Sequence, residues 1–300
     1  MFTQRRTRIA LATAAALGTA LAVSGCASSD PLAAETADAG TIVVGSQSYY
    51  SNEIIAEIYA QALENAGFTV DRQFDIGQRD AYMPELESGA ITLFPEYTGN
   101  LAQWLDSSIT DGTADEVYDA LVSALPDNLT ALDYSSATDQ DSYTVTRAFA
   151  DEWDLTSIAD LANVTDPLTL GGPAELADRP YGPTGLKSTY GIDIGFSATG
   201  DTTVEDLLAG TINVANIYTA DPAIQTDDLV TLTDPKGLLL PSNVVPIVNS
   251  DVAPDIEDVI NAISAKLTPE GLIALNVQST VDQENTADIA AQWLSDNGLS

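Results

Sequence analysis

The chain of 300 residues contains no histidine and only one cysteine, Cys26. A serine or cysteine nucleophile usually needs a histidine as its general base, and structural zinc sites are built from histidine and cysteine. Both kinds of site are therefore excluded, and a single cysteine cannot form a disulfide within the chain. We expect no enzymatic activity, no metal and no cofactor.

Basic residues are also scarce, because 10 Lys+Arg stand against 45 Asp+Glu. Nucleic acids are bound by basic stripes that meet their phosphates, so a nucleic-acid partner is excluded. The acidic surface has two interpretations, which the sequence leaves open. It attracts cationic ligands, or it only keeps an exported protein in solution.

Three short segments could suggest other chemistry, and none has a complete motif. Gly182–Ser188 has the glycines and lysine of a phosphate-binding loop, but their spacing is wrong and no strand precedes them. Asp139–Asp141 lacks the downstream glycine and glutamate of a calcium loop. A lipid-anchored hydrolase with two catalytic carboxylates remains the enzymatic alternative, although no spacing singles out such a pair.

The first 25 residues have the order of a secretory signal peptide. Arginines at positions 5, 6 and 8 precede the small and apolar run Ile9–Val23, which is short for a membrane span. Ser24, Gly25 and Cys26 resemble the lipobox of bacterial lipoproteins, which implies cleavage after residue 25 and lipidation of Cys26. Residues 26–40 carry little that could be buried and are expected to form the lipid-anchored tether.

From Thr41 onward the pattern alternates between short apolar strands and amphipathic helices, which predicts an α/β fold with a largely parallel sheet. A second series of strands begins at Tyr143, and closing helices follow a strand that contains Pro246 at an edge-like position. The expected strands are 41–45, 68–74, 91–94, 143–146, 168–170, 212–218 and 244–248, and the expected helices are 52–66, 80–86, 114–125, 157–162, 204–208, 256–265, 269–274 and 286–294.

The segment Leu93–Asn100 carries the most informative local signal. Pro95 cannot donate a backbone hydrogen bond, so we expect the strand to end there and a helix to begin near Thr98. Glu96 and Tyr97 would then follow the carboxyl end of a strand, which is where ligands bind in open α/β sheets. Tyr97 is predicted to be a wall of a ligand pocket.

Several segments together resemble the substrate-binding proteins of ABC importers for osmoprotectants, the glycine betaine, carnitine and choline group. The resemblance covers the chain from about Thr41 to its end, and Phe94–Gly99 is its most specific part. The other matching segments are Gly45–Asn52, Glu57–Glu64, Gly77–Arg79, Pro84–Gly89, Ser142–Tyr143, Gly171–Pro173 with Glu175 and Arg179, Gly185–Leu186, Tyr190–Gly191, Lys236–Gly237, Pro241, Asn243 and Pro246.

This resemblance implies a two-lobed periplasmic-binding-protein fold of type II, with the ligand cleft between the lobes. Lobe I would comprise 41–142 and 244–300, and lobe II would comprise 143–243. The protein would be a monomer on the extracytoplasmic face of the cell membrane, held there by lipid at Cys26. It would deliver a quaternary-ammonium solute to an ABC permease. A binding protein for a different small solute is the alternative.

The resemblance also implies the ligand-binding residues. Tyrosine rings of the family hold a quaternary ammonium group by cation–π attraction. The expected site is Tyr97, Tyr143, Tyr218, Arg179, Asn100, Gln47, Asn52 and Ser242.

Six of these residues have a structural alternative. Tyr97 would cap a core instead of lining a pocket. Tyr143 and Tyr218 would fill corners of the core, Arg179 would pair with an aspartate, and Gln47 and Asn100 would cap helices. Asp221 would either attract a cation or cap the segment that follows it.

Three positions depart from the family pattern. Ser242 stands where a fourth tyrosine is common, Gln47 where many members have lysine, and Asn100 where many have threonine. A ligand carboxylate would then keep Arg179 as its only charged partner, which weakens the case for glycine betaine itself.

Overall fold

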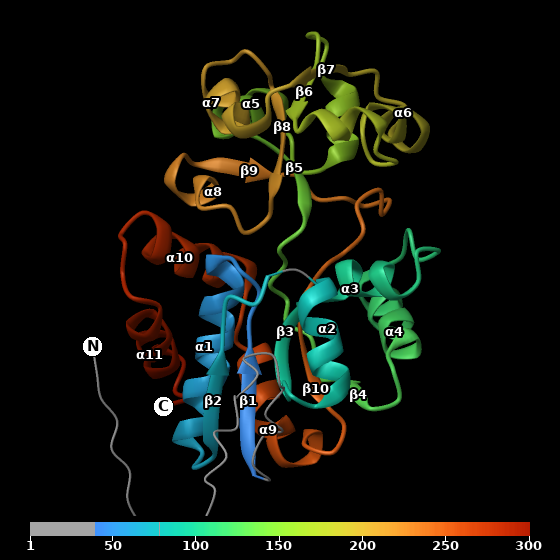
Figure 1. Cartoon of the computed structure of the whole chain (residues 1–300). Helices are drawn as coiled ribbons and strands as arrows, with labels where there is room; N and C mark the ends of the chain where they lie inside the picture. Colours follow the sequence, from blue (N-terminus) through green and yellow to red (C-terminus); the bar gives the residue numbers. More distant parts are fainter. Residues whose placement is uncertain (1–39, 78) are drawn as a thin grey trace, which may run out of the picture. The chain divides into compact units, whose positions relative to one another are not determined.

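The computed structural model describes residues 40–77 and 79–300, and the whole account of the fold refers to these residues. The predicted signal peptide, Cys26 and nearly all of the tether lie outside them. Two mixed five-stranded sheets organise the described chain, with strand orders β2-β1-β3-β10-β4 and β7-β6-β8-β5-β9 (Figure 1). The fold is therefore α/β and two-lobed, with one sheet in each lobe.

The strands lie close to the predicted ranges, and three of them (β4, β7 and β9) had no clear sequence signal. Their bounds are β1 Thr41–Gly45, β2 Thr69–Gln73, β3 Leu93–Tyr97, β4 Leu129–Ala131, β5 Asp141–Thr146, β6 Thr169–Gly172, β7 Gly195–Ala198, β8 Val214–Tyr218, β9 Leu229–Thr231 and β10 Val244–Asn249.

All the predicted helices form, although 157–162 is a 3-10 helix rather than an α-helix. The α-helices are α1 Tyr50–Asn65, α2 Arg79–Ser88, α3 Thr98–Leu105, α4 Ala114–Ala124, α5 Arg147–Trp153, α6 Pro183–Tyr190, α7 Thr203–Leu208, α8 Ala223–Thr226, α9 Ala253–Ser264, α10 Pro269–Thr280 and α11 Thr286–Asp296, and the 3-10 helices are η1 Ile158–Asn163, η2 Ala174–Asp178 and η3 Gly200–Thr202.

The first sheet is covered on both faces. Ile42 and Val44 of β1 point to one face, where they join a core with α1, α9, α10 and α11. Val43 points to the other face, where it packs with α2, α3 and α4 (Figure 1). This alternation follows from the two-residue period of a strand and explains why three consecutive residues of β1, 42–44, are all apolar.

The second sheet is built in the same way from its own residues. Tyr143 and Val145 of β5 pack with Leu170 and Val214 in a core that includes α5, η1 and α6. A smaller cluster around Leu207 of α7 covers the other face. Each sheet therefore has its own hydrophobic core. The lobe boundaries 41–142, 143–243 and 244–300 stay a prediction.

Two predictions about proline are wrong. β3 does not end at Pro95 but continues to Tyr97, and β10 is not an edge strand because it lies between β3 and β4. Pro95 and Pro246 stand opposite each other in the antiparallel β3–β10 pair. The backbone N–H of Val244 points to the same side of β10 as the nitrogen of Pro246, because the two residues are two positions apart. This N–H donates to the Ala137 carbonyl and not to β3. The register thus places both prolines at non-hydrogen-bonded positions of the β3–β10 pair, so their missing N–H groups remove no hydrogen bond between these two strands.

The first sheet is also less parallel than predicted. β1 pairs in parallel with β2 and β3, whereas β10 runs antiparallel to both β3 and β4. The late strand returns to a sheet begun by the first strands, and its direction could not be inferred from the alternating pattern that precedes it.

Candidate functional site

A cavity of about 380 Å³ lies where β1, β3 and β8 end. We call it the tyrosine pocket. Its volume lies within the usual range for small-molecule sites, roughly 300–1,000 Å³. Residues from both lobes form its wall: Gln47, Ser48, Tyr49, Tyr50, Arg79, Tyr97, Asn100, Asp139, Tyr218, Ala220 and Asp221.

Aromatic rings dominate this wall. Tyr97 ends β3 and is almost fully buried, and its ring stacks on Tyr49 with centroids 6.4 Å apart and 27° between the planes. Tyr50 meets Tyr49 edge to face at 6.4 Å. Tyr218 ends β8 and is 57% exposed, so its ring is open to solvent. Four tyrosines from three segments therefore line one pocket.

Asn52 fixes the position of the stacked pair from behind. Its side chain is fully buried and does not line the pocket. Nδ2 donates to the Pro95 carbonyl at 2.9 Å and to the Tyr97 hydroxyl at 3.5 Å, and Oδ1 accepts from the Gln47 amide at 2.8 Å. β1 ends before it can pair with Pro95, so the side-chain amide of Asn52 donates the hydrogen bond that a neighbouring strand would otherwise donate to the Pro95 carbonyl.

Gln47 lines the pocket with an unused donor. The residue is 6% exposed, and its Nε2 atom has no hydrogen-bond partner among the described residues. A buried donor without a partner costs free energy, so natural structures rarely leave one unless a ligand or water completes it. Gln47 therefore contributes a side chain with an unpartnered amide donor to the pocket wall.

Two carboxylates give the pocket its negative charge. Burial raises the pKa of Asp139 from 3.8 to about 6. Hydrogen bonds from the hydroxyls of Ser51 and Tyr49 stabilise the charged form and limit this rise. Asp221 lies close enough to raise that pKa further, and burial raises its own pKa as well. With a pKa of about 6, Asp139 is mostly ionised at neutral pH. Both acids are partly removed from solvent, which strengthens the attraction of their charged forms for a cation.

Arg79 is the one basic residue in the wall, and it is already neutralised. Its guanidinium donates twice to the Glu96 carboxylate, at 2.9 Å from Nε and 2.7 Å from Nη2. Tyr82 donates to the same carboxylate, which is fully buried. Burial opposes the charge of Arg79, but Glu96 outweighs that effect and raises its pKa.

Not every predicted site residue reaches this pocket. Gln47, Asn100, Tyr97 and Tyr218 line it, whereas Tyr143 does not. The Tyr143 ring is fully buried in the core of the second sheet, and its hydroxyl donates to the Tyr181 carbonyl. The strand period explains this, because Tyr143 faces α6 rather than the end of the sheet.

Ser242 and Arg179 are also absent from the pocket wall. Ser242 is 1% exposed, and its Oγ accepts from the Asn100 amide at 3.1 Å, so it positions the start of α3. Arg179 is exposed and makes no ion pair with another described side chain. Burial raises the pKa values of Tyr181 and Tyr218, and the positive charge of Arg179 opposes this rise. It lies beside the pocket rather than in it.

The sequence analysis missed Arg79 and Asp139 and assigned no role to Tyr49 and Tyr50. Asp139 had one available signal: it precedes a strand in a segment where Thr138 and Gln140 are also polar. Alternation along this extended segment puts Thr138 and Gln140 on one side and Asp139 on the other. Which side held the ligand pocket could not be read from the sequence.

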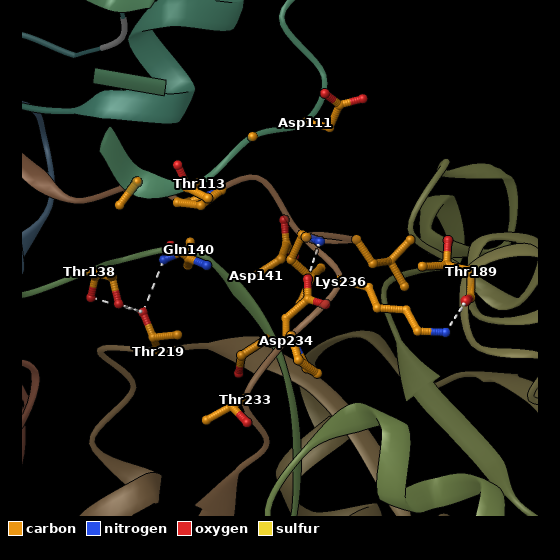
Figure 2. Close-up of a pocket in the computed structure, with 18 of the residues that line it drawn as sticks. Asp111, Thr113, Thr138, Gln140, Asp141, Thr189, Thr219, Thr233, Asp234 and Lys236 are labelled. Carbon is orange, nitrogen blue, oxygen red and sulfur yellow. Dashed lines mark hydrogen bonds between the residues drawn. The ribbon is translucent and has the colours of Figure 1, made fainter. Parts of the chain in front are cut away.

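A larger cavity of about 1040 Å³ lies on that opposite side (Figure 2). Its main charged groups have protein partners. Asp234 accepts from the Tyr190 hydroxyl and from the Leu239 amide at 2.6 Å, and Lys236 donates to the Thr189 carbonyl at 2.7 Å. The Asn243 Oδ1 atom lacks a partner among the described residues. No predicted aromatic wall residue lines this cavity, so it is the weaker candidate.

No group of acidic or cysteine side chains within the described ranges is arranged to hold a metal ion. The described helices also include none that is long and apolar enough to cross a membrane.

The chain matches a family model over residues 40–296, and the family is described as the substrate-binding domain of ABC-type glycine betaine transport systems. The chain belongs to this family. Its members are binding proteins of transporters and not enzymes, so the hydrolase alternative is set aside. The coarse function follows: this is a substrate-binding protein of an ABC transporter for solutes of the glycine betaine class.

Individual relatives are distant in sequence but close in fold. The glycine betaine-binding protein YehZ of Escherichia coli (strain K12) is 25% identical over 279 residues, which is 87% of this chain and 92% of that protein. The structure of apo YehZ from the same species superposes with a TM-score of 0.78 at 24% identity, covering 87% of this chain and 99% of the other.

The crystal structure of a glycine betaine/carnitine/choline ABC transporter protein gives a TM-score of 0.81 at 18% identity, covering 86% and 99% of the two chains. At these identities the structures establish the two-lobed fold and leave the ligand to be argued from the pocket.

Proposed function

We propose that the protein captures a quaternary-ammonium solute in the tyrosine pocket and delivers it to an ABC permease. The observation that carries the proposal is the stacked pair Tyr49 and Tyr97 in one wall with Tyr218, beside the carboxylates of Asp139 and Asp221. A methylated ammonium group gains roughly 0.5–2 kcal/mol from each desolvated ring face. Binding without chemistry agrees with the family to which the chain belongs.

The proposed cage differs from the one that the family resemblance implies. Tyr97 and Tyr218 keep their roles, Tyr49 and Tyr50 are added, and Tyr143 is left out because its ring is enclosed in another core. Gln47 and Asn100 supply polar contacts in the wall, while Asn52 and Ser242 hold them in place. Arg179 does not line the pocket, so its contact with a ligand carboxylate stays a prediction.

The cellular setting is part of the proposal. Residues 1–25 would be removed as a signal peptide, and lipid at Cys26 would hold the remaining chain on the extracytoplasmic face of the membrane. Residues 26–40 would serve as the tether, with 41–142 and 244–300 forming lobe I and 143–243 forming lobe II. A monomer in this position can present its closed form to the permease.

Isothermal titration calorimetry on the purified full chain tests the ligand class with glycine betaine, carnitine, choline and proline betaine. At least one should release or absorb heat with a stoichiometry near one. The variant Tyr218→Ala is suited to this test, since a side chain that is 57% exposed can be truncated with little loss of folding. It should bind the same ligand about fivefold more weakly. No heat with any of the four compounds would reject the quaternary-ammonium class.

A further inference from the structure

The charges around the tyrosine pocket do not suit a zwitterion. One arginine and two aspartates line it, and the arginine is already bound by Glu96 through two hydrogen bonds. A trimethylammonium group would find partners in the rings and in both aspartates. A carboxylate on the same molecule would have to be desolvated next to Asp139 and Asp221, and the pocket wall holds no cationic side chain that is free of a carboxylate partner.

We infer that the pocket selects an organic monocation without a carboxylate, with Asp139 and Asp221 as its counter-charge and Gln47 donating to an uncharged oxygen of the ligand. The inference rests on the proposed function and narrows it to one ligand charge. A trimethylammonium alcohol has this chemistry: a permanent cation, methyl groups for the rings, and a hydroxyl as the only polar group.

The unpartnered donor of Gln47 is the independent observation that points to an oxygen-bearing ligand. Its Nε2 atom is buried in the pocket wall without a partner among the described residues, and the backbone of Gln47 is held by Asn52. An amide N–H donates well to a hydroxyl or ether oxygen and carries no charge. An uncharged amide therefore gives a ligand carboxylate no charge-assisted hydrogen bond, which a cationic side chain at this position would supply.

The rival arrangement places a ligand carboxylate between Gln47 and the remaining nitrogen of Arg79. Nη1 of Arg79 has no partner among the hydrogen bonds of the described residues, so the arrangement is geometrically open. It requires Arg79 to share its charge between Glu96 and the ligand while two aspartates repel the same carboxylate. The experiment below distinguishes the two arrangements.

The test is calorimetry on the full chain with choline, glycine betaine and tetramethylammonium, which share a methylated nitrogen. Choline should bind at least about tenfold more tightly than glycine betaine. The carboxylate of glycine betaine loses its solvation in the pocket and is repelled by Asp139 and Asp221, which reduces the binding free energy. Glycine betaine binding as tightly as choline, or more tightly, would overturn the inference while leaving the quaternary-ammonium pocket intact. Heat with none of the three, nor with carnitine or proline betaine, would instead reject the proposed function.

Two variants locate the determinants. Asp139→Asn should weaken choline about tenfold and leave glycine betaine unchanged or improved, since an amide keeps the shape and loses the charge. Asp111→Asn is the matched control, an exposed acid that lines the other cavity, and it should change neither affinity. Equal weakening of choline by both variants would mean that only the overall charge matters and would overturn the role of Asp139.

Gln47→Ala tests the proposed donor. It should weaken choline several-fold and leave tetramethylammonium unchanged, because only choline has an oxygen atom. Unchanged choline binding, or a loss confined to glycine betaine, would contradict the donor role and would support the Arg79 arrangement.

Discussion

Tyr49 and Tyr97 stack with their ring centroids 6.4 Å apart and 27° between their planes, although 48 residues separate them in the sequence. Tyr49 lies before α1 and Tyr97 ends β3, and the parallel pairing of β1 with β3 brings the two positions to the same edge of the sheet. The stack forms one continuous aromatic face in the pocket wall. We derive four predictions from this face and its surroundings.

Truncating the stacked ring should remove most of the affinity. Tyr97→Ala loses a cation–π face and the support of Tyr49, so the dissociation constant should rise by about 10- to 30-fold. Tyr143→Ala is the matched control, because this tyrosine is equally buried but lies in the core of the second sheet. Both variants should unfold more easily, and only Tyr97→Ala should change the affinity of the folded fraction in calorimetry. Equal affinities would reject the cage.

The ligand-free protein should be more stable when Asp139 is neutral. Folding raises the pKa of Asp139 from 3.8 to about 6, so between these values the folded state binds more protons than the unfolded state. The contribution of Asp139 to the unfolding free energy therefore falls as the pH rises through this window and is lowest above pH 6.

Asp139→Asn should remove this penalty and raise the unfolding free energy at pH 7.5 by about 1–3 kcal/mol. The groups that interact with Asp139 and could alter the shift are Ser51, Asp221 and the four tyrosines of the pocket, Tyr49, Tyr50, Tyr97 and Tyr218. Urea unfolding from pH 4 to pH 8 measures it, and the two curves should converge near pH 4. A variant that is less stable at pH 7.5 would show that the hydrogen bonds of Asp139 outweigh its desolvation.

Removing the charge of only one partner of the Arg79–Glu96 ion pair should strongly destabilise the protein. Glu96→Gln leaves the guanidinium of Arg79 largely buried without its counter-charge, so the unfolding free energy should fall by about 3–5 kcal/mol. The exposed pair of Lys187 and Asp193 provides the comparison, and Asp193→Asn should change stability by less than about 0.5 kcal/mol. Chemical denaturation of both variants checks this, and similar losses would contradict the importance of burial.

Asn52 should matter to binding without contacting the ligand. Asn52→Leu has a similar shape but removes the hydrogen bonds to the Gln47 amide, the Pro95 carbonyl and the Tyr97 hydroxyl. We expect a loss of about 2–4 kcal/mol in unfolding free energy and a several-fold weaker affinity. Asn52→Asp keeps the acceptor for Gln47, so it should restore part of the affinity if positioning is the role. Full affinity in Asn52→Leu would show that the stacked rings hold their own geometry.

Much of the fold could be predicted because its signals are local. The apolar period of α1, the short strands and the turn residues each depend on neighbours within a few positions, and β1, α1 and β8 lie close to their predicted ranges. The two proline predictions failed for a non-local reason. Whether Pro95 ends a strand depends on the residue opposite it, and that residue is Pro246, 151 positions later in the chain.

The candidate site divides in the same way. Tyr97 could be predicted from the strand and motif that carry it, and Tyr218 from the end of its strand. Tyr143 does not line the tyrosine pocket, because the motif gives its position on a strand but not the face on which its ring is buried. The local signals of Asp139 and Arg79 are too weak to assign a role, since an acid in an acidic protein and a lone arginine both resemble surface residues until the partner segments are in place.

The sequence by itself determined the absence of histidine chemistry, the acidic charge, the α/β alternation and the family. Those properties depend on composition and on neighbouring residues, which any single chain displays. Only the tertiary structure decided which tyrosines share a wall, that Arg79 is neutralised by Glu96, and that two carboxylates remain for the ligand. Strand pairing and side-chain direction set these relationships, and both depend on contacts between residues far apart in the chain.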